Sequence, residues 1–322
     1  MKRDKSIDFL MFVAVLLVVN SHLESMYAVP FKALATGGII GDALFFFCSG
    51  YKLSLGRLDR FDNWFKRRLV RIYPSVLVWD ILAALVFSLP LTVGSLFDGW
   101  WFCGYWFIKC ILIHYLALYL ILRYFNRKMT LVLGLVCIGI GAWWCVSYSP
   151  KFAAEMLGAL SFEWYYLFAF TLSGAILARC ELLQVKLVPA LACLVVSVLG
   201  HYGWLGLVDR FPALMPFRIL MLFSLAAVVG SLYLLSKTDA VVRLMDRRVG
   251  LVMAAFGGLC LEVYISHNMI ETTRFNHLFP LNVLFFFMAV FALAYLIRCA
   301  TRLVVQTFDK NRRYDYREVF DF

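Results

Sequence analysis

The sequence predicts an all-α protein, a polytopic transmembrane helical bundle of about ten spans with both termini in the cytoplasm. Composition gives the first indication, because 63% of the 322 residues are hydrophobic and 16% are charged, against roughly 45–50% and 25% in soluble domains. Apolar blocks of about 20 residues recur along the chain, and this length crosses a hydrocarbon core of about 30 Å as a helix. Lys and Arg gather in alternate connections, as cytoplasmic loops do.

The apolar blocks place the expected spans near 8–23, 36–56, 70–90, 104–122, 130–148, 161–178, 187–206, 215–235, 249–270 and 281–304. The first block runs into SHLESMY without a small-residue cleavage site, so we expect a retained span rather than a signal peptide. Neither an internal repeat nor a long polar linker interrupts the series. Residues 1–322 are therefore expected to form a single integral-membrane domain, with a short basic cytoplasmic tail over about 305–322.

An even number of spans puts both termini on one side, and most of the 31 Lys and Arg residues fall at the N-terminus, in the even-numbered loops and in the tail. Arg298 and Arg302 are assigned to this basic flank of the last span. The positive-inside rule makes that side cytoplasmic. The net charge of +11 then follows from topology, and we expect no nucleic-acid partner.

Ionisable residues inside the apolar blocks are the first functional candidates, because each costs at least about 2.5 kcal/mol in a bilayer. His22 lies about 21 Å along the first span and His267 about 27 Å along the ninth, counting from their inner ends at 1.5 Å per residue. Both histidines are thus expected near the outer surface. Glu262 lies deeper, and must face a polar cavity or be protonated. The alternative for either histidine is a headgroup-level residue with no chemistry.

A basic segment on the opposite side, FKRRLVRIYPS over 65–75, supplies two further candidates. In a helix Arg67 and Arg71 stack one turn apart, and two guanidinium groups can clamp phosphates through bidentate hydrogen bonds. The alternative is an ordinary positive-inside flank. The nine cysteines form no CxxC pair or Cys/His cluster with metal-ligand spacing, so we expect packing residues and no metal site.

Six segments, taken in order, resemble the acyltransferase 3 family of integral membrane O-acyltransferases. They are SIDFLMFVAVLLVVNSH (6–22), GGIIGDALFFFCSGYKL (37–53), FKRRLVRIYPS (65–75), GYWFIKCILIHYLALYLIL (104–122), LFAFTLSGAILAR (167–179) and FGGLCLEVYISH (256–267). The resemblance implies transfer of an acyl group, expected to be acetyl, from cytoplasmic acyl-coenzyme A to a hydroxyl of an envelope polysaccharide or lipid-linked glycan. It also implies a bacterial cytoplasmic (inner) membrane location and no permanently bound cofactor, and leaves the oligomeric state open.

Carried onto this chain, the resemblance assigns the catalytic role to His22 and the binding of the acyl donor to Arg67 and Arg71. It also places substrate-binding roles on four residues: Trp106, Glu262, Tyr264 and His267. His22 would then act as general base, because an imidazole with an ordinary pKa of about 6.5 is largely neutral at neutral pH and can take a proton.

Three positions depart from the family pattern. Met11 stands where the family has Arg or Lys, and the acid of the second helix is Asp42, one place early, followed by Ala43. Cys260 replaces the usual serine of the late motif. A cation at position 11 would share a helix face with His22, because eleven residues at about 100° each fall about 20° from whole turns. Two alternatives stay open: a multi-span transporter or flippase, which the many spans and the intramembrane carboxylates would also fit, and a catalytically impaired family member, which Met11 suggests.

Overall fold

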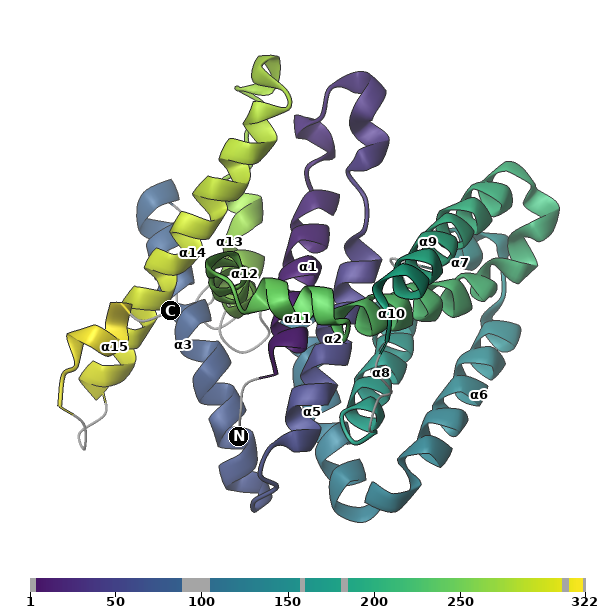
Figure 1. Ribbon diagram of the computed structural model, residues 1–322, viewed down its shortest axis with the longest axis horizontal. Helices are drawn as coiled ribbons and strands as arrows, with labels where there is room; N and C mark the ends of the chain where they lie inside the picture. The colour runs from purple at the N-terminus through teal and green to yellow at the C-terminus, as the bar shows by residue number, and fades with distance from the viewer. Residues whose placement is uncertain (1–3, 89–104, 157–159, 181–184, 309–312, 321–322) are drawn as a thin grey trace. The chain divides into compact units, whose positions relative to one another are not determined.

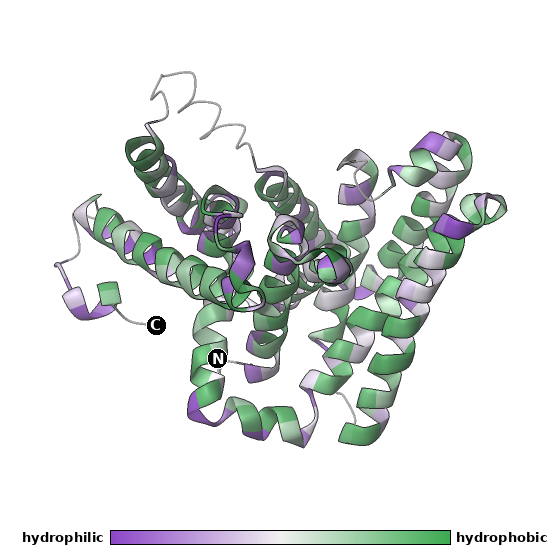
Figure 2. Ribbon diagram, turned by 90° about the horizontal axis from the view of Figure 1, so that it is seen from above, coloured by the Kyte–Doolittle hydropathy of each residue, from purple (hydrophilic) through white to green (hydrophobic). Residues whose placement is uncertain are grey.

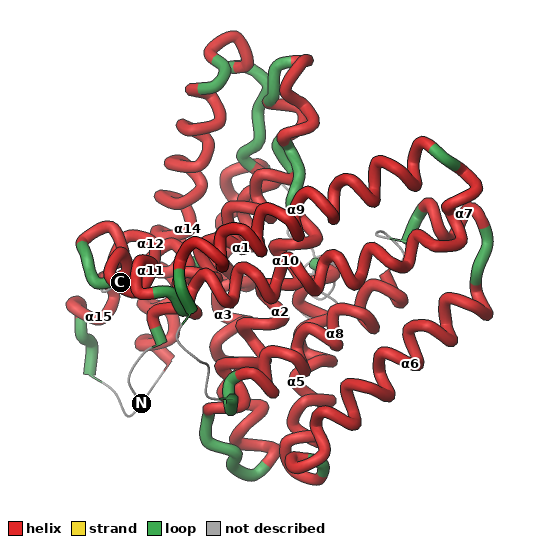
Figure 3. The backbone as a smooth tube through the Cα atoms, turned by 45° about the vertical axis from the view of Figure 1, so that its right-hand side comes forward, coloured by secondary structure: helices red, strands yellow, loops and turns green. Residues whose placement is uncertain are grey.

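The computed structural model describes residues 4–88, 105–156, 160–180, 185–308 and 313–320, and these residues form helices, turns and loops without a β-strand (Figure 3). The predicted all-α class is therefore confirmed. The α-helices in chain order (Figure 1) are α1 (Lys5–Ser21), α2 (Gly38–Leu55), α3 (Phe61–Phe87), α5 (Trp106–Tyr124), α6 (Met129–Ser147), α7 (Pro150–Ala154), α8 (Leu160–Leu177), α9 (Leu187–Arg210), α10 (Met221–Ser236), α11 (Asp239–Met245), α12 (Arg248–Gly258), α13 (Cys260–Ser266), α14 (Leu281–Phe308) and α15 (Tyr316–Phe320). Short 3₁₀ turns lie between them at Glu24–Met26, Val29–Leu34, Asn126–Lys128, Pro212–Leu220, His267–Met269 and Asn276–Leu278.

Each predicted apolar block contains a helix, and within the described residues seven helices are long and apolar enough to cross a membrane. A bent pair, α12 and α13, brings the number to eight if it counts as one span. Helices α1 and α8, 17 and 18 residues long, are not among them. Hydrophobic residues run along the long helices, while hydrophilic residues gather at several helix ends and turns (Figure 2). The chain is thus a helical membrane protein; the ten-span count and the cytoplasmic side of the termini stay predictions.

Two helices differ from the expected boundaries. The third begins at Phe61, nine residues before the predicted start, so the basic segment 65–75 is helical. The ninth span, expected to be continuous over 249–270, bends by 55° between α12 and α13. Helix α12 ends at the glycine pair Gly257 and Gly258, and glycine lowers the cost of breaking a helix.

The described chain divides into two compact units, each assembled from three segments. The first unit comprises Met1–Ala14, Ile39–Leu58 and Ile113–Ala254, and the second comprises Val15–Gly38, Asp59–Leu112 and Ala255–Phe322. Helix α1 contributes to both. The prediction of a single domain over 1–322 stays a prediction, and its expected tail over 305–322 includes residues 309–312 and 321–322, which lie outside the described residues.

In the first unit, α2 and α8 approach each other backbone to backbone. A Cβ added at Gly50 would lie 1.9 Å from the carbonyl oxygen of Thr171, and one added at Gly174 would lie 1.9 Å from that of Phe47. Both distances are far below van der Waals contact. The two glycines therefore set the helix separation, as small residues do in membrane helix pairs.

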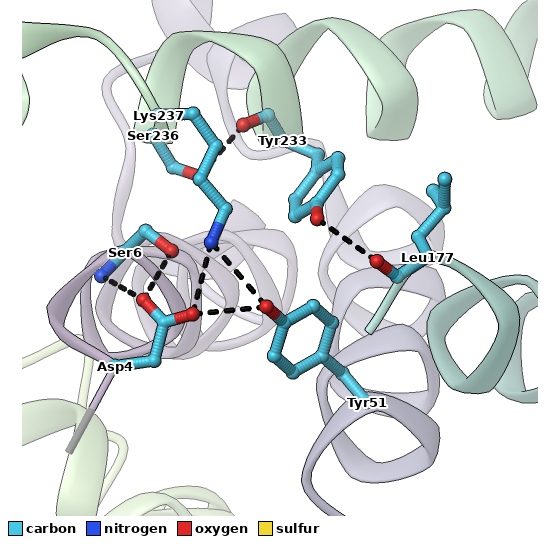
Figure 4. Close-up of polar contacts among 7 residues, drawn as sticks. All are labelled: Asp4, Ser6, Tyr51, Leu177, Tyr233, Ser236 and Lys237. Carbon is cyan, nitrogen blue, oxygen red and sulfur yellow. Dashed lines mark hydrogen bonds and ion pairs between the residues drawn. The ribbon is translucent and has the colours of Figure 1, made fainter. Parts of the chain in front are cut away.

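A polar cluster in the same unit fastens the N-terminus to α2 and α10 (Figure 4). Lys237 Nζ and the Tyr51 hydroxyl each donate to Asp4 Oδ2 at 2.9 Å, and Lys237 Nζ also lies 5.3 Å from the ring centroids of Tyr51 and Tyr233. Burial raises the pKa of the Asp4 carboxyl, but the hydrogen bonds from Ser6 and Lys237 outweigh it and leave the pKa below its usual value. The cluster contains no predicted site residue, and we assign it a structural role.

The second unit contains all seven predicted site residues. Its long helices α3 and α14 pack against each other, and both contact α13. Helix α13 carries Glu262 and Tyr264 and ends next to His267. This short helix therefore brings the late sequence motif onto the two longest helices of the chain.

Candidate functional site

The two predicted histidines meet in the second unit. His22 directly follows α1 and His267 directly follows α13, and their ring centroids lie 4.9 Å apart with the rings tilted by 57°. His22 is exposed, whereas His267 is only 1% exposed. Two histidines expected from separate helices at similar depth are thus in direct ring contact, while their depth in the membrane stays a prediction.

The tautomer of His267 follows from its neighbours. Its Nδ1 lies 3.1 Å from the carbonyl oxygen of Val263 and 2.9 Å from that of Tyr264. A carbonyl oxygen only accepts, so Nδ1 carries the proton and donates it. In the neutral ring Nε2 then holds the lone pair, and this buried atom has no hydrogen-bond partner among the described residues. His267 therefore presents an acceptor nitrogen beside His22.

The loop after α1 is fixed by amide side chains. Asn20 Nδ2 donates to the carbonyl oxygens of Leu34 and Thr36 at 2.7 and 3.0 Å, and the Tyr27 hydroxyl donates to Asn20 Oδ1 at 2.6 Å. The same loop is attached to the turn before α14 and to the start of α14, because Asn276 and Asn282 donate to the carbonyl oxygens of Ser25 and Met26 at 2.7 and 2.8 Å. These bonds hold the segment that carries His22 close to the segment that follows His267.

Glu262 is paired and fully buried, with an exposure of 1%. Arg298 binds it through two parallel hydrogen bonds, Nε to Oε1 at 2.7 Å and a terminal nitrogen to Oε2 at 2.6 Å. Ser75 Oγ donates to Oε1 at 3.0 Å. Arg298 also donates to the carbonyl oxygen of Gly258 at 2.7 Å, which lies at the break between α12 and α13. The guanidinium thus satisfies both the carboxylate and a carbonyl that the bend releases.

This ion pair faces a cavity of about 240 Å³. Its lining includes three arginines, two glutamates and three uncharged polar residues: Arg71, Arg298, Arg302, Glu262, Glu318, Ser75, Thr301 and Gln306. Of the predicted arginine pair, Arg71 lines the cavity and Arg67 does not; Arg67 forms an ion pair with Asp59. The helix does stack the two arginines one turn apart, but their neighbours differ.

The remaining two predicted residues lie in an aromatic cluster next to His267. The Tyr264 ring centroid lies 6.2 Å from that of His267, 4.9 Å from Phe107 and 6.1 Å from Tyr105. Trp106 begins α5, and its ring lies 5.9 Å from Phe107. The cluster gives the buried histidine an apolar wall, with Trp106 connected to it through Phe107.

The sequence analysis missed Arg298 as a site residue. It assigned Arg298 to the basic flank, although position 298 lies inside the expected span 281–304. The cost argument that selected Glu262 applies equally to an arginine in an apolar block, so the signal was present. Ser75 and Thr301 carry no comparable signal, because hydroxyl side chains are common in membrane helices.

Met11 is buried within α1, with 9% of its surface exposed. Asp8, one turn earlier, is also buried, and Lys52 Nζ from α2 lies 3.6 Å from its Oδ1. Asp8 therefore already has a cation beside it. That cation, Lys52, comes from α2, whereas the family pattern places a cation on the first helix. Asp42 lies on α2 in the first unit, and Cys260 lines the cavity.

Apolar helices, a pair of histidines in contact and a cavity lined by charged residues together define an integral membrane protein with a polar site. The model of the acyltransferase 3 family, described as an acyltransferase domain, matches residues 4–299. The chain therefore belongs to the acyltransferase 3 family, and it is a membrane acyltransferase. No curated protein and no solved structure matches it.

Proposed function

We propose that this protein transfers an acyl group, expected to be acetyl, from cytoplasmic acyl-coenzyme A to a hydroxyl of an envelope polysaccharide or lipid-linked glycan. We place it in the bacterial cytoplasmic (inner) membrane. The main observation behind the proposal is the contact between His22 and His267, because acyl transfer to a hydroxyl is accelerated by a base that takes the hydroxyl proton, and a neutral imidazole can be that base.

In the proposed reaction His22 takes the proton of the acceptor hydroxyl while the hydroxyl oxygen attacks the thioester carbonyl carbon. The carbon–sulfur bond then breaks, and the imidazolium returns the proton to the departing thiolate. His22 is the exposed ring of the pair, so an acceptor can approach it. His267 acts as a positioning residue, since its Nδ1 is held by two carbonyl oxygens and its Nε2 can accept a hydrogen bond from an N–H of His22.

For the acyl donor we propose that Arg71 binds an anionic phosphate group of coenzyme A at the cavity. Arg298 is engaged by Glu262, and Arg67 is engaged by Asp59. Both arginines would have to leave a carboxylate before binding a phosphate. Arg71 lines the cavity and is therefore the stronger candidate of the predicted pair, with Arg67 in a supporting role.

Replacing Arg71 by alanine is expected to weaken acetyl-coenzyme A binding about ten- to a hundredfold, since a charge-assisted hydrogen bond contributes roughly 1.5–3 kcal/mol. Arg67→Ala serves as the matched control one turn away, and should weaken binding less because Asp59 already engages that side chain. Titration of each purified variant with acetyl-coenzyme A gives the comparison. Unchanged affinity in both variants would return the two arginines to the role of topology markers.

Transfer itself is tested with radiolabelled acetyl-coenzyme A added to membranes that contain or lack the protein. The expected result is label in the glycan fraction only where the protein is present, with a matching increase in glycan mass. A transporter or flippase would move a glycan without labelling it. Absence of label with every envelope glycan of the host would contradict the proposal.

The residue at position 11 is expected to affect the rate of acyl transfer. We expect Met11→Lys to raise the transfer rate by up to about tenfold, or about 1.4 kcal/mol off the barrier, because a positive charge in a poorly solvated site favours negative charge developing on the thioester oxygen. Met11→Leu controls for packing. If Lys and Leu give equal rates, Lys52 beside Asp8 already supplies the needed charge and Met11 is a tolerated departure.

A further inference from the structure

The cavity lined by Arg71 has an unbalanced set of charges. Arg298 and Glu262 neutralise each other through two hydrogen bonds. The other charged lining residues are Arg71, Arg302 and Glu318, two cations and one anion. Apart from Glu318, the charged residues beside the Arg298–Glu262 pair are both cations, so the cavity favours an anionic group, and the Glu318 carboxylate is one such group.

Glu318 reaches the cavity because the short helix α15 is docked on α14 (Figure 1). The Arg302 guanidinium donates to the carbonyl oxygen of Glu318 at 2.9 Å. Gln306, only 4% exposed, donates to the carbonyl oxygen of Asp315 at 3.2 Å and accepts from its backbone N–H at 3.0 Å. Tyr295 donates to the carbonyl oxygen of Phe320 at 3.0 Å. The docking thus relies on polar contacts and on one fully buried side chain of α15, Val319.

A second observation indicates a ligand in the same cavity. Thr301 lines it, is 7% exposed, and its Oγ1 atom is buried without a hydrogen-bond partner in the described part of the chain. A buried hydroxyl without a partner costs free energy that an incoming acceptor would recover. Thr301 lies between Arg298 and Arg302 on α14, so a phosphate oxygen in the cavity could accept from it.

The docked segment also lies beyond the family domain, because the family match ends at residue 299. Arg302, Gln306 and the whole of α15 follow that point. The cavity is thus lined by residues of the matched domain, by the last turns of α14 and by Glu318 of α15, and the latter two follow the end of the match.

We propose that α15 is a cap on this cavity, and that Glu318 occupies the place of an anionic group of the ligand. The inference rests on the proposed function in one respect: the ligand is taken to be a phosphate-bearing acyl donor. Binding of the donor displaces Glu318, and α15 leaves α14. Donor affinity is therefore lower with the cap in place than without it.

The test measures binding of coenzyme A, and separately of inorganic pyrophosphate, to the full chain in lipid nanodiscs. Glu318→Gln keeps the shape of the side chain and removes its charge, and we expect it to bind coenzyme A about three- to fivefold more tightly, the range for a partly screened charge pair. The gain should shrink at high salt. Glu155→Gln, an exposed carboxylate outside the cavity lining, is the matched control and should change nothing. A variant ending at Phe308 should gain at least as much as Glu318→Gln.

Hydrogen exchange of residues 313–320 supplies a second measurement, with faster exchange expected when coenzyme A is added. Equal affinity of Glu318→Gln and the unchanged protein for both probes, or unaltered exchange, would overturn the cap. If Arg71→Ala weakens coenzyme A binding while Glu318→Gln has no effect, the cap is wrong and the donor site stands. If only pyrophosphate binds, and binds Glu318→Gln more tightly, the cap stands and the acyl-coenzyme A function fails. If neither probe binds, the cap is wrong.

Discussion

Replacing His22 by alanine is expected to lower acyl transfer by about 10²–10⁴-fold, the range that a general base contributes, while the protein stays in the membrane. The loss should appear in the rate at saturating donor, because His22 is placed at the reacting hydroxyl and does not line the cavity that holds Arg71. Radiolabelled acetyl transfer measures the rate, and donor titration shows whether binding is retained.

His277→Ala is the matched control for this variant. His277 is an exposed histidine of the same unit, within the turn Asn276–Leu278, and its replacement should leave the rate within about a factor of two. His267→Ala should give an intermediate loss, since it removes the neighbour of His22 and leaves the base in place. A His22→Ala rate above a tenth of the original would show that His22 is not the base.

Replacing Arg298 by methionine should cost about 3–5 kcal/mol of stability, because breaking a buried ion pair from one side leaves an uncompensated charge. Within the described residues Glu262 would keep a hydrogen bond from the Ser75 hydroxyl but lose both bonds from Arg298, and the Gly258 carbonyl would lose the Arg298 donor. The midpoint of thermal unfolding in detergent should fall by several degrees. The free energy of unfolding gives the same comparison where unfolding is reversible.

The double variant Glu262→Gln with Arg298→Met should recover most of this loss, because it removes both charges. Arg60→Met is the matched control. Arg60 pairs with Asp62 in the same unit, but its side chain is 83% exposed, so its replacement should cost less than about 1 kcal/mol. Equal losses for Arg298→Met and Arg60→Met would show that the Glu262 pair is as well solvated as a surface pair.

Much of the fold was predictable because membrane-spanning helices can be located from the length of the apolar segments alone. Each expected block contains a helix, and the residues that the cost argument selected, His22, Glu262 and His267, lie together in one unit. Hydropathy does not show where a span bends. At the break between α12 and α13, Arg298 of another helix donates a hydrogen bond to the Gly258 carbonyl oxygen, and no local sequence pattern contains that information.

The charged partners were less predictable for a related reason. A charge at the end of an apolar block is consistent both with topology and with a buried pair, and sequence spacing cannot distinguish the two. Arg67 and Arg71 share one helix face but have different neighbours. Arg67 pairs with Asp59, whereas Arg71 lines the cavity. The structure distinguishes two arginines with the same sequence signature by the different neighbours of each.

The interleaving of the two units has a consequence for how the protein is made. His22 enters the membrane with the first helix, but His267 is synthesised 245 residues later, roughly ten to fifty seconds at about 5–20 residues per second. During that interval the loop after α1 lacks Asn276 and Asn282, which donate to its backbone in the finished protein. The histidine pair therefore forms only late in translation, and a chain that ends before residue 267 is inserted into the membrane without the pair.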